Sequence, residues 1–218
     1  MFKHKDVQFE EVETKTINGK RHYITPKGNF PSITTVLSVL SRKGIAEWRA
    51  RVGEAEADKI GRIACGRGTN VHLMCEQYVN NELDESKFMP DVKAMFNSIK
   101  PILKERIGEV YAQEMPMWSS YLGVAGRVDC IAEFDGKLAV IDYKTASKTK
   151  KKEWISSYFQ QASAYCVMFE ERTGVPVNQL VTLIVVDNEE PQIFIEKRDT
   201  WTSKLIETIG VYNERENN

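Results

Sequence analysis

Hydrophobic and polar positions along this chain follow helical spacing in some stretches and strand-like alternation in others. Residues 12–25 alternate polar and β-favouring side chains around Asn18-Gly19, a dipeptide that favours a two-residue hairpin turn. A capped helix start is followed by a short predicted helix over 31–41. Residues 44–80 have a mostly helical pattern that four glycines interrupt, which predicts two or three helical segments: Gly53, Gly61, Gly66 and Gly68.

The second half of the chain has the pattern of a sheet with covering helices. Predicted helices cover 90–105, 154–172 and 201–212, and predicted strands cover 110–118, 124–134, 138–143, 180–186 and 192–197. This order predicts an α/β fold, with a mixed central β-sheet flanked by helices and an N-terminal hairpin and helical elaboration. We expect one compact domain, in which the hairpin and helical region 1–105 packs on a core formed by 106–218.

Composition and charge exclude several classes of protein. With 218 residues, of which 28% are charged and 42% hydrophobic, the chain suits one globular domain. Its net charge is -1, so nucleic-acid contacts would have to come from local basic patches. The four cysteines lack CxxC spacing, which argues against a zinc knuckle or a disulfide framework. We expect a cytoplasmic protein without signal peptide, transit peptide or membrane contact, since the start is polar and no apolar run approaches about 20 residues.

A second hairpin turn fixes the relation between two acidic residues. Asp135-Gly136 lies between two strand-like stretches and favours a type I′ turn. Counting residues outward from that turn places Asp129 directly opposite Asp142. Facing positions in an antiparallel pair bring their Cβ atoms to roughly 4.5–5.5 Å on one face of the sheet. The hairpin therefore predicts two carboxylates side by side.

Two facing carboxylates repel each other, and a divalent cation between them converts the repulsion into coordination. Lys144 lies two residues beyond Asp142, so it shares the same face about 6.6 Å along the strand. A lysine there can orient or help to deprotonate a water molecule and can offset charge on a phosphate. The alternative is a solvated edge hairpin, in which Asp142 pairs with Lys144 or Arg127.

Three further positions carry side chains suited to the same chemistry. His72 and Glu76 lie four residues apart, hence on one helical face, and neutral imidazole can bind Mn²⁺. Gln161 and Tyr165 have the same spacing on the helix after the Asp-x-Lys strand, where they can position water or a phosphate. Glu114 on the first predicted strand can assist a metal. Each position also fits an ordinary core or surface role.

Basic and aromatic residues provide candidate nucleic-acid contacts. A lysine run follows the presumed site, and arginines and tryptophans occur in and near the predicted helices. A basic run is also typical of a solvated loop, and aromatic residues at such spacing are typical of a core. The candidate contacts are Lys148, Lys150, Lys151, Lys152, Arg49, Arg67, Trp48 and Trp154.

Taken in order, the motifs resemble those of RecB-like PD-(D/E)XK nucleases. Residues 31–37 and 48–53 resemble, more narrowly, phage exonucleases related to the mitochondrial genome maintenance exonuclease. Val128 replaces the proline after which the superfamily is named. The resemblance runs from about 31 to 165 and rests on Gly68-Thr-x-x-His72-x-x-x-Glu76, Gly126-Arg-Val-Asp129, Ile141-Asp-Tyr-Lys-Thr145 and Gln161-x-x-x-Tyr165.

The resemblance implies a restriction-endonuclease-like core with a Mg²⁺ or Mn²⁺ site. The residue roles that it implies are metal ligands at His72, Asp129, Asp142 and the Tyr143 carbonyl, a catalytic lysine at Lys144, residues orienting water or substrate at Gln161 and Tyr165, and a supporting acid at Glu114. Related nucleases with an iron–sulfur cluster carry several cysteines near the C-terminus. No cysteine lies beyond Cys166, so we expect no such cluster here.

These features together predict a metal-dependent DNA exonuclease that prefers single-stranded ends, of the kind used by phages in DNA replication, recombination or repair. The chain lacks a helicase P-loop, so we expect unwinding to need a partner, namely a helicase, a single-strand-binding protein or a recombination protein. Two alternatives stay open: a structure-selective endonuclease of the same fold, and a catalytically idle nucleic-acid-binding module.

Overall fold

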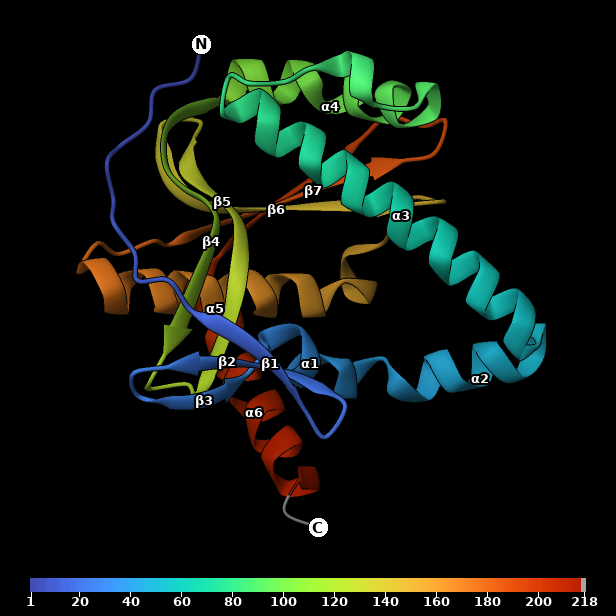
Figure 1. Ribbon diagram of the computed structural model, residues 1–218, viewed down its shortest axis with the longest axis vertical. Coiled ribbons are helices and arrows are strands. Elements are labelled where there is room, and N and C mark those ends of the chain that lie inside the picture. The colour runs from blue at the N-terminus through green and yellow to red at the C-terminus, as the bar shows by residue number, and fades with distance from the viewer. Residues whose placement is uncertain (217–218) are drawn as a thin grey trace.

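The computed structural model describes residues 1–216 and contains two β-sheets (Figure 1). The smaller sheet is antiparallel, with the order β1-β2-β3, and the larger is mixed, with the order β4-β5-β6-β7-β8. β6 and β7 are parallel, and the other neighbours in the larger sheet are antiparallel. The strands are β1 (Glu13–Ile17), β2 (Lys20–Thr25), β3 (Gly28–Pro31), β4 (Ile107–Ser119), β5 (Val124–Phe134), β6 (Lys137–Ala146), β7 (Gln179–Val186) and β8 (Gln192–Lys197).

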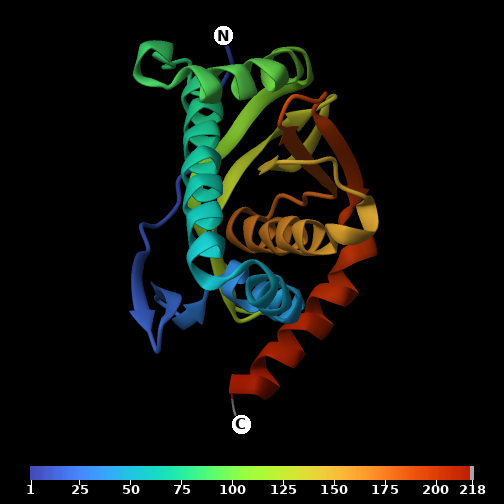
Figure 2. The same cartoon turned by 90° about the vertical axis from the view of Figure 1, so that its right-hand side faces the viewer.

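Helices cover both faces of the larger sheet (Figure 2). The helices are α1 (Ile33–Leu37), α2 (Arg42–Val52), α3 (Glu54–Val79), α4 (Pro90–Arg106), α5 (Ser156–Thr173) and α6 (Arg198–Glu216), with short 3-10 turns η1 (Ser38–Leu40), η2 (Glu85–Lys87) and η3 (Lys152–Trp154). None of the helices among residues 1–216 is long and apolar enough to cross a membrane. The mixed sheet with flanking helices, the N-terminal hairpin and the helical elaboration all match the fold predicted from the sequence.

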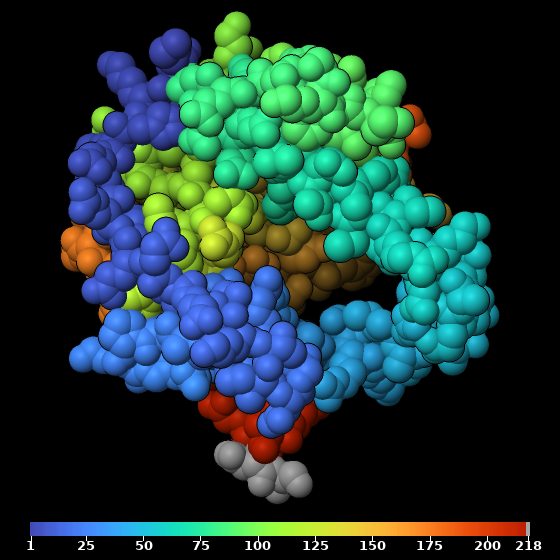
Figure 3. Space-filling model, viewed as in Figure 1, coloured from blue at the N-terminus to red at the C-terminus, as the bar shows by residue number. Residues whose placement is uncertain are grey.

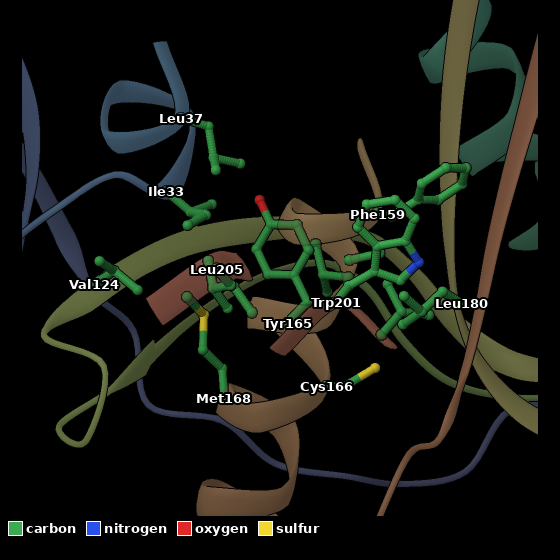
Figure 4. Close-up of a cluster of buried hydrophobic side chains, with 14 of the residues drawn as sticks. Ile33, Leu37, Val124, Phe159, Tyr165, Cys166, Met168, Leu180, Trp201 and Leu205 are labelled. Atoms are coloured by element: carbon green, nitrogen blue, oxygen red, sulfur yellow. The ribbon is translucent and has the colours of Figure 1, made fainter. Parts of the chain in front are cut away.

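The hydrophobic core consists of two layers, one on each face of the larger sheet. On one face, α3 and α4 pack on alternate residues of the strands, among them Ile141 and Leu183. On the other face, α1, α5 and α6 enclose a cluster in which the rings of Phe159 and Trp201 lie 4.7 Å apart (Figure 4). Each fully buried large apolar side chain contributes roughly 1.5–3 kcal/mol. Both layers join residues from the first hundred positions to the sheet, so the N-terminal region is attached on both sides.

Both predicted hairpin turns are present with the expected backbone. Asn18 and Gly19 have φ values of 51° and 73°, and Asp135 and Gly136 have 53° and 73°, as a type I′ turn requires. From the second turn the β5–β6 register runs from Phe134 opposite Lys137. It continues without a slip to Cys130 opposite Ile141, the pair directly before Asp129 and Asp142. The predicted register is therefore confirmed up to the edge of the acidic pair.

The long helical region contains two helices, as predicted, but only one of the four glycines separates them. Gly53, with φ 88°, ends α2 and starts α3, whereas α3 continues unbroken through the other three glycines. Tertiary packing outweighs the roughly 1 kcal/mol that each helical glycine costs relative to alanine. Gly68 has a structural reason, because a Cβ atom there would lie 3.4 Å from the Thr145 hydroxyl. The helix can therefore approach the end of β6 closely.

The smaller sheet is joined to the larger one beside the predicted site. The Ser32 N–H donates to the Arg21 carbonyl at 2.9 Å, and Ser32 forms an isolated parallel bridge with Ala125 of β5. Ser32 also begins α1, with its hydroxyl accepting the Thr35 N–H at 3.1 Å. This junction places β2 and α1 against the strand that carries Asp129.

Candidate active site

Asp129, Asp142 and Lys144 meet where β5 and β6 separate. The Asp129 carboxylate accepts the Tyr143 N–H at 2.8 Å. This side-chain hydrogen bond lies directly after the last paired residues of β5 and β6. Lys144 Nζ donates to Asp142 Oδ1 at 2.5 Å. Asp142 is 1% exposed and the Asp129 side chain 13%, which argues against the solvated edge hairpin considered above. The three side chains form a largely buried charged group.

His72 and Glu114 complete a cluster around Asp129. His72 Nδ1, from α3, lies 3.5 Å from Asp129 Oδ2. One ligand atom each from His72, Glu114 and Asp129 lies within 4.8 Å of the others, and this trio could hold a metal ion. Asp142 is not part of that trio, and its Oδ1 accepts a hydrogen bond from Lys144.

Glu114 approaches Asp129 across the β4–β5 pairing. The flanking pairs, Gln113 with Cys130 and Met115 with Val128, bracket Glu114 and Asp129. The Glu114 φ of 46° is uncommon for a non-glycine residue, and such strain is found most often at functional sites. Counting outward from the short β4–β5 turn, as was done for the β5–β6 turn, would have revealed this second facing acid.

The acidic side chains of the cluster have shifted pKa values because they are buried and lie close to other charged groups. Burial raises the pKa of Glu114 to about 7, and the nearby charges of Asp129 and Glu76 add to the shift. Burial also raises the pKa of Asp142 to about 6, with Asp129 adding to it while Lys144 opposes it. Burial acts likewise on Asp129, but the hydrogen bond and charge of His72 outweigh it and lower the pKa. The site thus holds more acid than its own cations neutralise.

The chemistry of the site fits a divalent cation. Asp142 Oδ2 is buried and has no hydrogen-bond partner in the described part of the chain. An unpartnered buried carboxylate oxygen is costly unless it binds a proton or a cation. Carboxylate oxygens with one imidazole nitrogen form a ligand set suited to Mn²⁺ or Mg²⁺. The raised pKa values of Asp142 and Glu114 share one main cause, which is burial of the carboxylates, and the charge of Asp129 adds to both shifts.

Lys144 remains charged in this setting. Burial acts to lower its pKa, but the charges of Asp142 and Asp129 outweigh burial and raise the pKa. Its ammonium group also lies 5.1 Å from the centre of the Tyr158 ring. A buried, permanently positive group beside the acids can interact with an anionic substrate.

Gln161 and Tyr165 of α5 reach the same cavity. Gln161 Nε2 donates to the Tyr165 hydroxyl at 3.5 Å, so the predicted i, i+4 pair is in contact. Figure 4 shows Tyr165 beside Ile33 and Leu37 of α1. A Cβ atom on Gly126 would lie 2.8 Å from the Tyr165 ring and 3.0 Å from an Ile33 methyl group. The glycine in the Gly126-Arg-Val-Asp129 motif therefore allows the tyrosine ring to pack on the β5 backbone.

Gly126→Ala is expected to lower the free energy of unfolding by about 1–3 kcal/mol, because the added methyl group overpacks a closed site. It should also displace Tyr165 and so reduce activity. Gly210→Ala is the matched control, since nothing lies within 4 Å of a Cβ atom there and alanine favours its helix. Denaturant unfolding of both variants checks this. Equal stability of Gly126→Ala and the wild type would contradict the packing described.

These side chains line one cavity of about 670 Å³. Residues from α3, β4, β5, β6 and α5 contribute to it. They include all of the predicted catalytic and metal-binding residues except Asp142 and Tyr143. Asp142 and Tyr143 lie behind its wall, 1% and 2% exposed, in contact with Lys144 and Asp129 respectively. The cavity is also lined by Arg21, Tyr23, Thr34 and Arg127, which the sequence did not single out for the site. The alternation of β5 indicates Arg127, because it lies two residues before Asp129.

The predicted nucleic-acid contacts lie outside this cavity. Arg49 pairs with Glu54 and Asp58, Arg67 with Asp187, and Lys152 with Glu196. Lys151 lies 5.4 Å from the ring centre of Trp154, whose side chain is exposed. The other candidates are Lys148, which is exposed, and Lys150 and Trp48, which are partly buried. Their contact with a substrate stays a prediction.

Comparison with known proteins identifies the superfamily. The human protein Mitochondrial genome maintenance exonuclease 1 is 30% identical over 173 residues, which cover 72% of this chain and 48% of the human protein. The protein of the same name from Xenopus tropicalis is 29% identical over 132 residues, covering 56% and 38%. The chain thus spans about half the length, or less, of these curated relatives.

Among solved structures, a putative exonuclease from Eubacterium rectale matches with a TM-score of 0.47 and 13% identity, over 68% of this chain and 65% of that one. A family model, described as the PD-(D/E)XK nuclease superfamily, matches residues 92–210, which is more than half of the 218 residues. The matched segment contains β4, β5 and β6 with Asp129, Asp142 and Lys144. The chain belongs to the PD-(D/E)XK nuclease superfamily.

Proposed function

We propose that this protein is a metal-dependent DNA exonuclease that prefers single-stranded ends. The observation that carries the proposal is the group formed by Asp129, Asp142 and Lys144, with His72 and Glu114 beside it, at one cavity. The superfamily of nucleases to which the chain belongs supports hydrolysis of phosphodiester bonds. The two curated relatives, both named as exonucleases, support attack from strand ends.

The ligands that we propose for Mg²⁺ or Mn²⁺ are His72, Asp129, Asp142 and the Tyr143 carbonyl, with Glu114 as a further acid. When bound, such a cation supplies Lewis acidity and lowers the pKa of a coordinated water. Asp142 has one carboxylate oxygen free for this role while the other holds Lys144. Glu114, whose pKa burial raises to about 7, carries negative charge that such a cation would stabilise.

Lys144, Gln161 and Tyr165 act on the phosphate and the attacking water in this proposal. The buried Lys144 ammonium group offsets the negative charge that develops on the phosphate, and its contact with Asp142 fixes its position. Gln161 and Tyr165 line the same cavity, where their amide and hydroxyl groups can orient water or substrate oxygens. Orientation of reactants by fixed groups lowers the entropic part of the barrier.

The preference for single strands is supported by the shape of the molecule. α2 has no buried residue, and together with the N-terminal part of α3 it forms an arm that stands away from the body. Figure 3 shows the molecule hollowed between this arm and the body. The cavity reaches this region through Cys65, Thr69 and Leu73 of α3. An opening bounded by a helical arm suits a flexible strand that enters by its end.

Two end-labelled substrates and one circle test the proposal. With Mn²⁺, single-stranded oligonucleotides labelled at the 5′ or the 3′ end should be shortened stepwise, and matched duplexes more slowly. A covalently closed single-stranded circle should stay intact. Cleavage of the circle would replace the exonuclease proposal with a structure-selective endonuclease. Intact linear DNA in the presence of bound metal would indicate a catalytically idle nucleic-acid-binding module.

We place this activity in DNA replication, recombination or repair, in a phage or in the cytoplasm of its bacterial host. Double-stranded substrates would need a helicase, a single-strand-binding protein or a recombination protein as a partner. We also propose that region 1–105 and the core 106–218 act as one compact domain. The two buried layers that join these regions support this proposal.

A further inference from the structure

Two arginines line the cavity although the chemistry above does not use them. Arg127 comes from β5 of the larger sheet, and Arg21 comes from β2 of the smaller sheet. Within residues 1–216, neither guanidinium group has a carboxylate within 4.0 Å. Arg49 and Arg67, outside the cavity, are both paired with acids. The cavity thus contains two cations available to an anion.

The backbone holds each arginine in a defined place. Arg127 lies two residues before Asp129 on the same face of β5, about 6.6 Å along the strand. Its guanidinium group donates to the Glu114 carbonyl, which leaves its other N–H groups free to bind an anion. Arg21 Nη2 donates to the Thr34 hydroxyl at 3.3 Å. Arg127 therefore borders the acidic cluster, where its charge acts on Glu114 and Glu76, and Arg21 lines the same cavity.

Tyr23 shows that the two arginines converge. Its ring is 2% exposed and lines the same cavity. Burial raises the pKa of Tyr23, while the positive charges of Arg21 and Arg127 both act to lower it. Arg21, Tyr23 and Arg127 all line the one cavity, which places both guanidinium groups in the same region. The Ser32–Ala125 bridge joins the two sheets at this point and accounts for the convergence.

We infer that Arg21 and Arg127 form a second phosphate subsite, which holds the phosphodiester next to the one that is cleaved. This inference rests on the proposed function and assigns part of the substrate site to the smaller sheet, outside residues 92–210 of the superfamily match. Guanidinium groups bind phosphate oxygens in a bidentate manner. Lys144 and the proposed cation bind the phosphate that is cleaved. The arginine pair is therefore placed to bind the adjacent phosphate of the strand. Holding that neighbour fixes the strand relative to the catalytic group.

The salt dependence of DNA binding tests this subsite without catalysis. Binding of a fluorescein-labelled single-stranded oligonucleotide is measured in EDTA over a series of KCl concentrations. Each phosphate contact that is lost should reduce the slope of log K against log salt by about 0.7. Arg21→Gln and Arg127→Gln should each show this reduction, whereas Arg21→Lys and Arg127→Lys should retain the slope. Arg215→Gln is the matched control, because it removes one exposed arginine on α6 outside the cavity.

A neutral linkage in the substrate locates the contact. A single methylphosphonate, moved along the oligonucleotide one position at a time, should slow wild-type cleavage of the adjoining linkage about tenfold. That slowing should become smaller in Arg127→Gln, which leaves Arg21 alone at the subsite, and should disappear in the Arg21→Gln/Arg127→Gln double variant, which has neither arginine to bind the phosphate charge. Thermal unfolding confirms that each variant is folded, and Arg21→Met and Arg127→Met, which remove the charge but keep an apolar stem, provide the same test should a glutamine variant fail to fold.

The outcomes separate the two proposals. Unchanged salt slopes for Arg21→Gln and Arg127→Gln, in a wild type that cleaves DNA, overturn the subsite alone. Methylphosphonate slowing that persists at full size in Arg127→Gln overturns it as well. A wild type that binds DNA and metal but never cleaves overturns the proposed function, while a reduced slope in the variants would still support the arginine pair as a phosphate site.

Discussion

Lys144→Ala is expected to reduce cleavage of single-stranded DNA by about a thousandfold or more while the protein still binds DNA. The lysine is 19% exposed in its side chain and its ammonium group contacts Asp142 at 2.5 Å. It is therefore a largely desolvated charge at the proposed reaction centre, where a fixed charge would act far more strongly on a developing phosphate charge than it would in water. Single-turnover digestion of an end-labelled oligonucleotide measures the loss, and fluorescence anisotropy measures binding.

Lys104→Ala is the matched control for that experiment, because it removes an exposed lysine of α4 that does not line the cavity. It should cleave at the wild-type rate. Since Lys144→Ala leaves Asp142 buried without its partner, Lys144→Met is the second variant, which retains the packing of the side chain. A folded Lys144→Met protein with wild-type cleavage would refute the catalytic role of this lysine.

Removal of divalent cations is expected to stop cleavage and to lower the melting temperature. Addition of Mn²⁺ at about 100 times its dissociation constant should stabilise the protein by about 2.7 kcal/mol. For a chain of this size that corresponds to a rise of roughly 5–10 °C in melting temperature. The physical reason is that a cation compensates the negative charges of Asp142 and Glu114, whose pKa values are raised by burial and further by the nearby Asp129 carboxylate. Thermal melts with EDTA and with increasing Mn²⁺ measure the effect independently of activity.

Asp129→Asn should remove most of the Mn²⁺ effect, since Asp129 belongs to the ligand trio with His72 and Glu114. His72→Ala should weaken it similarly. His22→Ala provides the control, because that imidazole contacts the Lys20 carbonyl on the smaller sheet, away from the cluster. A full Mn²⁺-induced rise in Asp129→Asn would show that the cation binds elsewhere and would contradict the proposed centre.

Much of the site could be predicted from the sequence because its decisive element is local. The type I′ turn at Asp135-Gly136 requires positive φ values at both residues, and this fixes the register of the hairpin within a few positions. Register in turn fixes which side chains share a face, so Asp129, Asp142 and Lys144 were placed together correctly. The helical spacing of Gln161 and Tyr165 likewise predicted their contact. In each case the information lies within a few residues.

Other features of the site depend on contacts between distant segments. Glu114 faces Asp129 through the β4–β5 pairing. The Asp135-Gly136 turn fixes only the β5–β6 register, so it gives no information about this second pair. The orphaned Asp142 oxygen and the raised pKa values exist only because the folded protein excludes water from them. Of the six basic residues chosen from the sequence, three pair with acids, and two of these pairs join distant positions, namely Arg67 with Asp187 and Lys152 with Glu196.

By itself, the sequence determined the elements, the hairpin register and the identity of the central acids and lysine, since turn chemistry and periodicity act over a few residues. Only the tertiary structure decided which charges stay unpaired and which reach the cavity. Arg21 enters it through a contact between two sheets about a hundred positions apart in the chain, at Ser32 and Ala125. Charge pairing and burial are set by such long-range packing, and no local pattern of side chains encodes them.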